Sequence, residues 1–437
     1  MATIPTPTLI SQATAILGAA TSLQKQLEQH GLQQPSFEAN GRKDWQDASE
    51  HPEILKARSA LIDASNLMLN LALGPVDTLC SLTGPAVSKI EALRTLDTLR
   101  VPEAVPHEGS ISVEDLGAKL SVNSRLLRQQ LRFAYLLGIF YEPRDGFVAH
   151  TSISAAMTSV SPWTQMRLSY LFNSGSWKIP DALRTWQDPA PPGHVQVPVS
   201  LADQQHQDFW KILQRDNKGM EKFSSAMKAL LASHLGNSAA LFVKGFNWEA
   251  LGGGQVIDIG GGSGHIEVNI LKEIPSGVNF LIQDLATNEI PANETIKLHG
   301  AEDRIQFQAH DFFSPQPSEL QPKAYLLSRV LHDWQDTDCV RIVRNLIPAM
   351  TKYGTKLFVM ERVLPDHIGD IPNHMEQLIR TQDLLMFTLF GGSERSQAEW
   401  SRLFKKADAR FKIAATCHSL LSPFSFMEVV IDKGDSL

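Results

Sequence analysis

The stretch Val256-Ile-Asp-Ile-Gly-Gly-Gly-Ser-Gly264 decides the fold of this chain. Residues 256–259 are an apolar run with a single acid, Asp258, and they predict a buried strand. The strand leads into a turn that contains four glycines. In an α/β fold, a strand followed by such a turn and a helix lets backbone amides approach a nucleotide-like ligand. The stretch therefore predicts an α/β domain with a ligand at this turn.

The turn does not match the common phosphate-binding patterns. A dinucleotide site uses Gly-x-Gly-x-x-Gly, and here Gly260 and Gly262 fit while His265 occupies the third glycine position. No Gly-Lys-Ser or Gly-Lys-Thr follows, so the turn is not a P-loop. The acid before the turn, Asp258, instead favours a cationic or amine-bearing ligand.

Two further acids end predicted strands and narrow the choice of ligand. Asp284 follows the apolar run 279–283, and a carboxylate there can accept hydrogen bonds from both hydroxyls of a ribose. Asp311 follows the run 304–308 and precedes Phe312, and a carboxylate beside an aromatic ring suits the exocyclic amine of a flat base. Together these residues describe an adenosine with an amino-acid tail, which is S-adenosylmethionine.

The composition limits the class of protein. The 437 residues are enough for two domains, and 43% hydrophobic with 20% charged residues is ordinary for a soluble globular protein. The net charge of −7 argues against nonspecific nucleic-acid binding as its main work. The three cysteines, Cys80, Cys339 and Cys417, have no metal-ligand spacing, so we expect neither a zinc site nor a disulfide framework.

The N-terminus and the apolar runs bear on the location of the protein. The first residues lack the basic region of a signal peptide. The longest uncharged apolar run, 66–74, is too short to span a bilayer. We therefore expect a cytoplasmic protein that does not contact a membrane.

The pattern divides the chain into three predicted domains. Residues 1–83 form a helical extension with helices over 8–30 and 52–80, whose leucines and alanines indicate burial against another helix or subunit. Residues 84–195 form a second, mainly helical domain. Residues 196–437 form the ligand-binding domain, and the proline-rich segment 186–200 before it is a linker or surface loop.

The second domain has the pattern of a helix-turn-helix followed by a wing. Helices are predicted over 86–99, 112–120 and 123–137, and short strands over 139–141 and 146–150. Arg125, Arg128 and Arg132 on the third helix allow a DNA-binding interpretation. The leucines interleaved with these arginines and the acidity of the chain favour a protein-packing module instead.

The third domain alternates between strands and helices. Strands are predicted over 255–259, 279–283, 304–308, 323–329, 355–361 and 424–431, and helices over 264–273, 336–350, 373–388 and 396–407. This alternation predicts an α/β fold with a doubly wound, Rossmann-like parallel sheet.

One histidine has the right position and surroundings for a general base. His332 follows a predicted strand, and ligands in open α/β sheets lie beyond the carboxyl ends of strands. A phenol needs its proton removed before it attacks a methyl donor, and histidine is the natural acceptor. The acids Glu361 and Glu394 can fix the tautomer of this histidine. Asp333 and Asp336 have a competing role as caps of the helix that follows.

Four motifs resemble the plant caffeate and flavonoid O-methyltransferases and their fungal, sterigmatocystin-type relatives of polyketide pathways. They are Val256-Ile-Asp-Ile-Gly-Gly-Gly-Ser-Gly264, Arg329-Val-Leu-His-Asp-Trp-Gln-Asp336, Met360-Glu-Arg-Val-Leu-Pro365 and Gly391-Gly-Ser-Glu-Arg-Ser396 with Glu399-Trp400. The resemblance covers roughly residues 85–432, and it implies an N-terminal winged-helix dimerisation domain. It also implies His332 as the base with Glu361 and Glu394 beside it.

The resemblance also implies binding residues for the cofactor and the acceptor. The cofactor residues would be Gly260, Gly262, Asp284, Asp311 and Phe312. Trp210, Phe223 and Met227 match the helix that covers the acceptor, although ordinary core positions explain these three equally well. The lysine usual in the plant enzymes is replaced by Ser328, with Arg329 next to it as a cofactor contact. Leu385, Met386 and Leu389 form an apolar wall that suits a bulky aromatic polyketide.

Two functional hypotheses follow. The favoured one is an O-methyltransferase, without a metal, that acts on a phenolic or enolic hydroxyl of a small aromatic secondary metabolite and forms a homodimer through its N-terminal helices. The alternative is a methyltransferase-like pericyclase or dehydratase that binds S-adenosylmethionine without transferring methyl. Accumulation of S-adenosylhomocysteine distinguishes the two.

Overall fold

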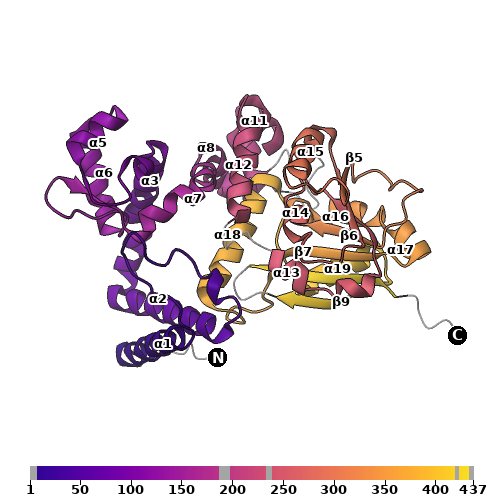
Figure 1. Cartoon of the computed structure of the whole chain (residues 1–437), viewed down its shortest axis with the longest axis horizontal. Helices are drawn as coiled ribbons and strands as arrows, with labels where there is room; N and C mark the ends of the chain where they lie inside the picture. Colours follow the sequence, from indigo (N-terminus) through magenta and orange to yellow (C-terminus); the bar gives the residue numbers. More distant parts are fainter. Residues whose placement is uncertain (1–6, 187–196, 233–238, 419–422, 433–437) are drawn as a thin grey trace. The chain divides into compact units, whose positions relative to one another are not determined.

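The computed structural model describes residues 7–186, 197–232, 239–418 and 423–432 (Figure 1). Most of the predicted linker 186–200 lies outside these residues. The chain forms two compact units, and each is made of three segments: Met1–Asn173, Asn217–Leu235 and Pro372–His374 for the first, and Ser174–Asp216, Gly236–Ile371 and Met375–Leu437 for the second.

These units do not coincide with the predicted domains. The predicted extension 1–83 and most of the predicted domain 84–195 belong to a single unit, whereas the segment after Asn173 groups with the sheet. Helix α12 (Gly219–Ala232) belongs to the first unit because it packs along α7 (Ser152–Arg167). Such long-range packing has no signal in local composition.

The N-terminal helices form where the apolar periodicity predicts them. Helix α1 (Leu9–Gln29) packs along α2 (Pro52–Ser81), and α3 (Gly84–Thr98) follows. Helix α2 has a break that the sequence analysis did not predict. Gly74 has a φ of 72°, which glycine adopts readily, and Pro75 next to it lacks the N–H of a continuous helix.

The predicted helix-turn-helix is present, and a side chain caps the start of each of its helices. Helix α5 (Val113–Leu120) is capped by the side chain of Ser112, and α6 (Ser124–Leu136) by that of Asn123. The other helices of this unit are α4 (Val101–Ala104) and α8 (Tyr170–Ser174, at its boundary). On the wing, Asp145 lies 2.6 Å from a guanidinium nitrogen of Arg128, so this arginine is already paired with an acid.

The wing itself differs from the prediction. Strand β2 (Phe147–Val148) pairs antiparallel with β1 (Ile111–Ser112), not with a strand at 139–141. Only an isolated bridge between Tyr141 and Ala149 remains of the predicted hairpin. The cause is Phe140, which is fully buried with a φ of 65° and therefore cannot continue an extended strand.

The second unit contains the predicted central sheet, with a mixed rather than purely parallel pattern. The strand order is β5-β4-β3-β6-β7-β10-β9, and β8 pairs with β7. The first five strands of this order are parallel, whereas β10 runs antiparallel to both β7 and β9. The strands are β3 (Gly254–Ile259), β4 (Val278–Asp284), β5 (Ile305–Ala309), β6 (Ala324–Ser328), β7 (Lys356–Leu364), β8 (Arg395–Ser396), β9 (Phe411–His418) and β10 (Phe424–Ile431).

Helices flank this sheet and depart from the prediction at several places. They are α9 (Ile179–Thr185), α10 (Pro198–Ala202), α11 (Phe209–Arg215), α13 (Ala239–Lys244), α14 (His265–Ile270), α15 (Glu289–Leu298), α16 (Asp336–Arg344), α17 (Ile347–Tyr353), α18 (Asn373–Phe390) and α19 (Gln397–Ala407). Helices α9, α10, α13 and α15 were not predicted. The predicted helix 336–350 is divided between α16 and α17 just before Pro348, which cannot donate a helical hydrogen bond.

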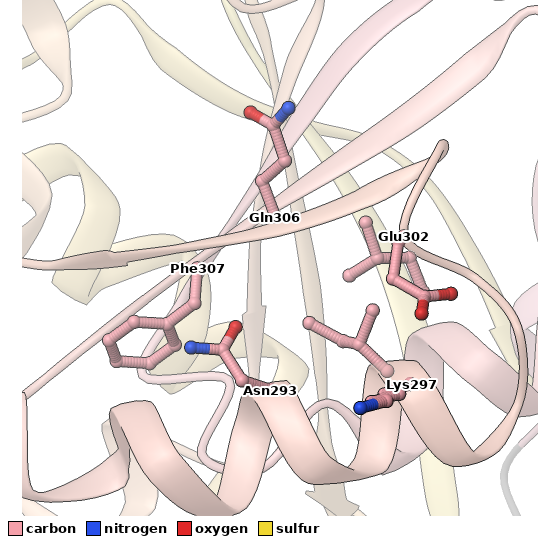
Figure 2. Close-up of a pocket in the computed structure, with 7 residues that line it drawn as sticks. Asn293, Lys297, Glu302, Gln306 and Phe307 are labelled. Carbon is pink, nitrogen blue, oxygen red and sulfur yellow. The ribbon is translucent and has the colours of Figure 1, made fainter.

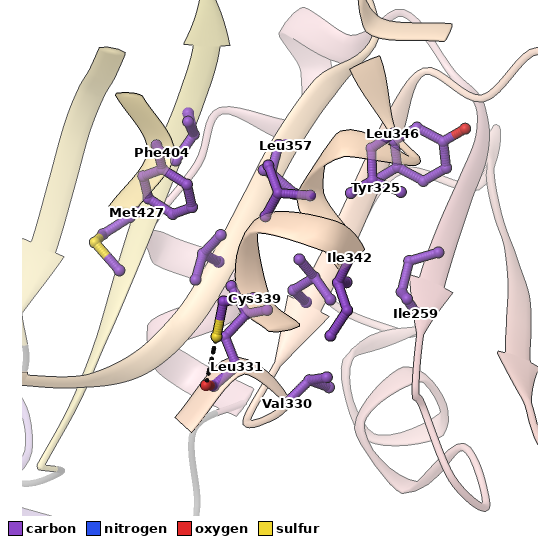
Figure 3. Close-up of a cluster of buried hydrophobic side chains, with 14 of the residues drawn as sticks. Ile259, Tyr325, Val330, Leu331, Cys339, Ile342, Leu346, Leu357, Phe404 and Met427 are labelled. Atoms are coloured by element: carbon purple, nitrogen blue, oxygen red, sulfur yellow. Dashed lines mark hydrogen bonds between the residues drawn. The ribbon is translucent and has the colours of Figure 1, made fainter. Parts of the chain in front are cut away.

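Alternate residues of the sheet feed two apolar cores. Val256 faces the core that includes residues of α13, α14 and α15. Ile257 and Ile259 face the core that includes residues of α16, α17 and α19 (Figure 3). In this second core the thiol of Cys339 donates to the carbonyl of Leu331, directly before the predicted base. Both faces of the sheet are thus covered, which leaves the strand ends for a ligand.

Among the described residues, no single helix has the length and apolar character to cross a membrane. The bent pair of α2 and α3, which meet at 64°, passes such a test only when the two are taken together.

Candidate active site

The glycine turn lies against Phe312, the aromatic residue predicted to bind the adenine of the cofactor. Gly260 has a φ of 75°, and a Cβ there would lie 3.0 Å from the Val330 side chain and 3.6 Å from the Phe312 ring. A larger residue would therefore fill the space above the end of β3. Gly262 is also left-handed, with a φ of 59° and open space on the side of a Cβ. The turn thus presents bare backbone, as a close-fitting cofactor requires.

Asp284 at the end of β4 is joined to the turn. One carboxylate oxygen accepts from the amide of Gly262 at 2.8 Å, and the other accepts from the amide of Leu285 and the side chain of Asn288. The predicted ribose acceptor and the glycine turn are therefore in direct contact. They are therefore close enough to contact the same ligand.

Asp311 and Phe312 follow β5 in the predicted order. Asp311 is exposed and accepts from the amide of Phe313, which leaves a second carboxylate oxygen open to a ligand. The Phe312 ring is half-buried and packs edge-on against Trp334, with ring centroids 5.8 Å apart. An exposed carboxylate next to a held aromatic ring suits an adenine.

Asp258 does not lie in the open site. It is 1% exposed and shares a buried region beneath the turn with Glu267 of α14, which is fully buried. Burial and the nearby Glu267 raise the pKa of Asp258, and burial likewise raises the pKa of Glu267. A carboxylate Oδ2 of Asp258 would lie 2.4 Å from a Cβ at Gly261. The acid before the turn therefore lies buried beside Gly261 instead of facing a ligand openly.

Arg329 occupies an unusual backbone position at the end of β6. Its φ is 57°, and its amide donates to the carbonyl of Met360 on β7. The guanidinium is 5.7 Å from the Phe424 ring, and its Nε has no hydrogen-bond partner within the described residues. Burial and the neighbouring Arg362 lower the pKa of Arg329 to about 10. A half-buried cation with an unused, buried donor suits a carboxylate.

His332, Glu361 and Glu394 meet as predicted. His332 lies on the short 3-10 turn η5 (Leu331–Asp333), Glu361 on β7, and Glu394 just before β8. The Nδ1 of His332 is 3.1 Å from Glu361 and 3.2 Å from Glu394, and all three side chains are buried. On the other side of the ring, Nε2 is 3.5 Å from the carboxylate of Asp333.

The carboxylates control the charge of the histidine. Burial alone would lower the pKa of His332, but Glu361, Glu394 and Asp333 outweigh it and raise the pKa to about 9. Burial raises the pKa of Asp333 to about 7, and Glu361 and Glu394 contribute to this rise. The three acids therefore favour the protonated imidazole at neutral pH.

Backbone contacts hold both glutamates in place. One oxygen of Glu361 accepts from the amides of Val330 and Leu331, each at 2.9 Å. The amide of Glu394 donates to the side chain of Asp383 on α18. Because these bonds join β7, α18 and the turn η5, the carboxylates have little freedom to move away from the imidazole.

Two arginines that follow these glutamates were missed by the sequence analysis. Arg362 donates to Glu394 at 3.1 Å. Arg395 donates to the carbonyls of Leu331 and Trp334, so it holds both ends of η5. The sequence did indicate these arginines, because Arg362 directly follows Glu361 and Arg395 directly follows Glu394.

Asp336 does not cap its helix as considered. The N-cap of α16 is Gln335, and Asp336 accepts from Arg395 at 3.1 Å and from Lys406 at 2.8 Å. Its carboxylate therefore anchors the arginine that holds the histidine turn. Asp333 likewise makes no cap, since it faces His332.

The predicted acceptor residues lie on different units. Leu385 and Met386 are buried on α18, and Trp210 on α11 is half-buried with its ring 5.6 Å from that of Phe390. Phe223 and Met227 are half-buried on α12, which belongs to the first unit. Leu385 and Met386 are therefore part of α18, and Trp210 packs against the end of the same helix.

A surface hollow of about 490 Å³ lies elsewhere, between α15 and β5 (Figure 2). Its lining includes Asn293, Lys297, Glu302, Gln306 and Phe307. It contains none of the predicted site residues and is formed by the outer edge strand of the sheet. We therefore assign the active site to the strand ends instead.

A sheet with a glycine turn, a ribose-type carboxylate and a buried histidine at its strand ends defines an α/β enzyme that binds a nucleoside cofactor. Comparisons with known proteins specify the family. The O-methyltransferase domain profile matches residues 203–410. The O-methyltransferase aurJ of Gibberella zeae is 32% identical over 94% of this chain and 95% of its own. The chain belongs to the S-adenosylmethionine-dependent O-methyltransferases of fungal secondary-metabolite type.

Other relatives support this assignment. The O-methyltransferase FrzF of a Cladobotryum species is 32% identical over 82% of this chain and 84% of its own. The crystal structure of OxaC matches 97% of this chain and 99% of its own, with a TM-score of 0.76 and 20% identity. NcsB1, solved with S-adenosylmethionine and a hydroxylated naphthoic acid, matches 79% and 96%, with a TM-score of 0.61 and 24% identity. The two structures share the fold of this chain.

Proposed function

We propose that the enzyme methylates a phenolic or enolic hydroxyl of an aromatic secondary metabolite, with His332 as the general base. The carrying observation is the buried histidine whose Nδ1 lies within 3.2 Å of two glutamates. With Nδ1 held by these acids, Nε2 is the nitrogen that can take a proton from an acceptor hydroxyl. Glu361 and Glu394 then stabilise the imidazolium that forms.

The cofactor residues are assigned by their chemistry. S-adenosylmethionine supplies an electrophilic methyl group when bound. The bare backbone of Gly260 and Gly262 would face its amino-acid tail and ribose, Asp284 would accept from the ribose hydroxyls, and Asp311 with Phe312 would bind the adenine. The guanidinium of Arg329 would pair with the carboxylate of the methionine tail.

The acceptor is proposed to be a bulky aromatic polyketide. Leu385, Met386 and Trp210, all in the second unit, provide apolar area for such an acceptor. A flat polycyclic phenol buries more apolar surface against such residues than a small hydroxycinnamate does. The hydroxylated naphthoic acid bound by NcsB1 has this character. A panel of fungal polyketide phenols, incubated with labelled methyl donor, tests the choice.

A homodimer through the N-terminal helices is part of the proposal. Helices α2 and α3 expose a row of large apolar side chains: Leu67, Leu69, Val76, Leu79, Leu82, Val87 and Ile90. Soluble proteins seldom leave such a row open to water, so a second copy is the natural cover.

Replacing His332 with alanine tests the proposed base. We expect His332→Ala to lower kcat/KM by about 10²–10⁴-fold, the usual contribution of a general base. Binding of S-adenosylhomocysteine, measured by calorimetry, should stay within about twofold, because the imidazole serves the acceptor and not the cofactor. His367→Ala, at an exposed histidine of the same unit, is the matched control. Full activity of H332A would remove the base from the mechanism.

The same assay separates methyl transfer from the alternative reaction. A pericyclase or dehydratase would convert its substrate with no S-adenosylhomocysteine formed. Stoichiometric formation of S-adenosylhomocysteine and methylated product supports the transferase, whereas conversion without it would overturn the proposal.

A further inference from the structure

We propose that Arg362 is a positioning residue that keeps His332 able to accept a proton, by drawing the charge of Glu394 away from the imidazole. This inference rests on the proposed role of His332. Within the described residues, Arg362 contacts Glu394, and Glu394 in turn contacts His332. The effect of Arg362 on the imidazole therefore passes through Glu394.

The geometry places a single oxygen between the two cations. Oε1 of Glu394 lies 3.1 Å from Nη1 of Arg362 and 3.2 Å from Nδ1 of His332. The side chains of the three residues are 0–9% exposed. Water is largely excluded from this group, so the charges act on one another in a medium of low dielectric constant.

The charges around His332 show why a second cation matters. Three acids face the imidazole: Asp333 from its own turn, Glu361 from β7 and Glu394 from the segment before β8. Within the described residues, Arg362 is the one lysine or arginine within ion-pair distance of any of these acids. Without it, a histidine surrounded by three acids would retain its proton even more strongly.

Arg362 is held where it can act. It lies on β7 opposite Phe424 of the antiparallel strand β10, and its guanidinium is 4.3 Å from the centre of that ring. Arg329 faces it from the end of β6. Burial and, next to it, repulsion from Arg362 lower the pKa of Arg329. Burial would raise the pKa of Glu394, but His332 and Arg362 together lower it, so the arginine does stabilise the carboxylate charge.

The direction of the effect follows from the signs of the charges. The neutral imidazole is the active base, so kcat/KM rises with pH up to the pKa of His332, which is about 9. Loss of the Arg362 charge leaves the full field of Glu394 on the imidazole. This favours imidazolium and moves the acid limb of the profile to higher pH.

The experiment compares pH profiles of kcat/KM for wild type, Arg362→Gln and Arg362→Lys across roughly pH 6 to 10. We expect R362Q to shift the acid limb upward by about 0.5–1 pH unit, with a 3–10-fold loss at neutral pH. R362K retains the charge and should keep the limb near that of wild type. Arg410→Gln removes an exposed arginine of the same unit and should leave the profile unchanged.

Two additional measurements keep the test decisive. Glu394→Gln should move the acid limb of the kcat/KM profile to lower pH. Arg362→Gln in that background should move the limb by less than half the shift that it causes in wild type. An NMR titration of His332 in the enzyme bound to S-adenosylhomocysteine should show the same shifts without turnover. If R362Q does not fold, R362K and E394Q with this titration still decide the matter.

The outcomes are distinguishable. A uniform loss of kcat in R362Q with an unmoved limb and an unmoved His332 titration would make Arg362 merely structural and overturn the inference. Full activity of H332A would instead remove the proposed base, whatever the arginine variants do. The inference is supported if the acid limb lies at higher pH in R362Q and near its wild-type pH in R362K.

Discussion

At the scale of single residues, the site is dominated by how buried charges are paired. His332 would lose its proton easily if burial acted alone, but the surrounding acids raise its pKa to about 9. Arg329 is the opposite case, a half-buried cation whose buried Nε has no hydrogen-bond partner in the described part of the chain. Such an unused donor is costly unless a ligand satisfies it.

The role of Arg329 can be tested with two nucleosides. If it pairs with the carboxylate of the methionine tail, Arg329→Met should weaken S-adenosylhomocysteine binding by about 10–100-fold, the cost of a charge-assisted hydrogen bond. Binding of 5′-methylthioadenosine, which lacks that carboxylate, should change by less than about twofold. Calorimetry gives both constants, and Arg402→Met at an exposed arginine is the control. Equal weakening of the two ligands would contradict the assignment.

Residue identities predicted much of the site. Asp284 contacts the glycine turn, and Glu361 and Glu394 meet His332, because all follow strands or loops at one edge of the sheet. Burial of Asp258 was not predictable, since it depends on Glu267 from a helix packed over the turn. Local sequence does not state which buried acids will face each other.

At the scale of elements, the turn η5 and the segment Gly391–Arg395 determine where the base lies. Arg395 holds η5 through two carbonyls, and Gly392 lies directly against it. A Cβ at Gly392 would be 2.0 Å from the carbonyl oxygen of His332. No side chain can be accommodated there without displacing the base, so this glycine is required by close approach of two backbones.

The contact predicts a strong effect of one methyl group. Gly392→Ala should destabilise the protein by about 1–3 kcal/mol, as overpacking does, and lower kcat/KM far more than S-adenosylhomocysteine affinity. Thermal unfolding and steady-state kinetics measure the two effects. Gly18→Ala, in the middle of α1 with nothing near its Cβ, should instead stabilise by about 0.5–1 kcal/mol. Wild-type kinetics in G392A would show that the turn can shift freely.

Helices and strands with a strong apolar periodicity were predicted. Strands whose position depends on the strand with which they pair were not. Helices α1, α2 and α6 and strands β3 to β7 lie at the predicted positions within a few residues. Strand β9 was missed, since its residues alternate only weakly between buried and exposed. The wing was wrong because the partner of β2 precedes the helix-turn-helix instead of following it.

At the scale of the whole molecule, the first unit carries the apolar surface that would join two copies. The large exposed apolar side chains of this unit are concentrated on α2 and α3, among them Leu79, Leu82 and Val87. The exposed apolar residues of the second unit, such as Leu298, come from several different helices and loops. Scattered single residues are normal, whereas a row on adjacent helices indicates an interface.

Light scattering after gel filtration tests the dimer. The wild-type mass should be twice the chain mass of 48.4 kDa, and Leu79→Glu with Leu82→Glu should reduce it to one chain mass, since buried charges oppose association. Leu298→Glu, on the second unit, should leave the mass unchanged. A monomeric wild type at micromolar concentration, or a dimer unaffected by both glutamates, would refute the proposed interface.

The sequence by itself determined the class of fold and the cofactor, and it pointed to the proposed base with its two glutamates, because each follows from short motifs near strand ends. Only the tertiary structure decided the rest. It made the sheet mixed, buried Asp258 against Glu267, and placed Arg362 and His332 on one oxygen of Glu394. The physical reason is that pairing, burial and pKa depend on neighbours that are distant in the chain, whereas a motif reports only on its own strand or turn.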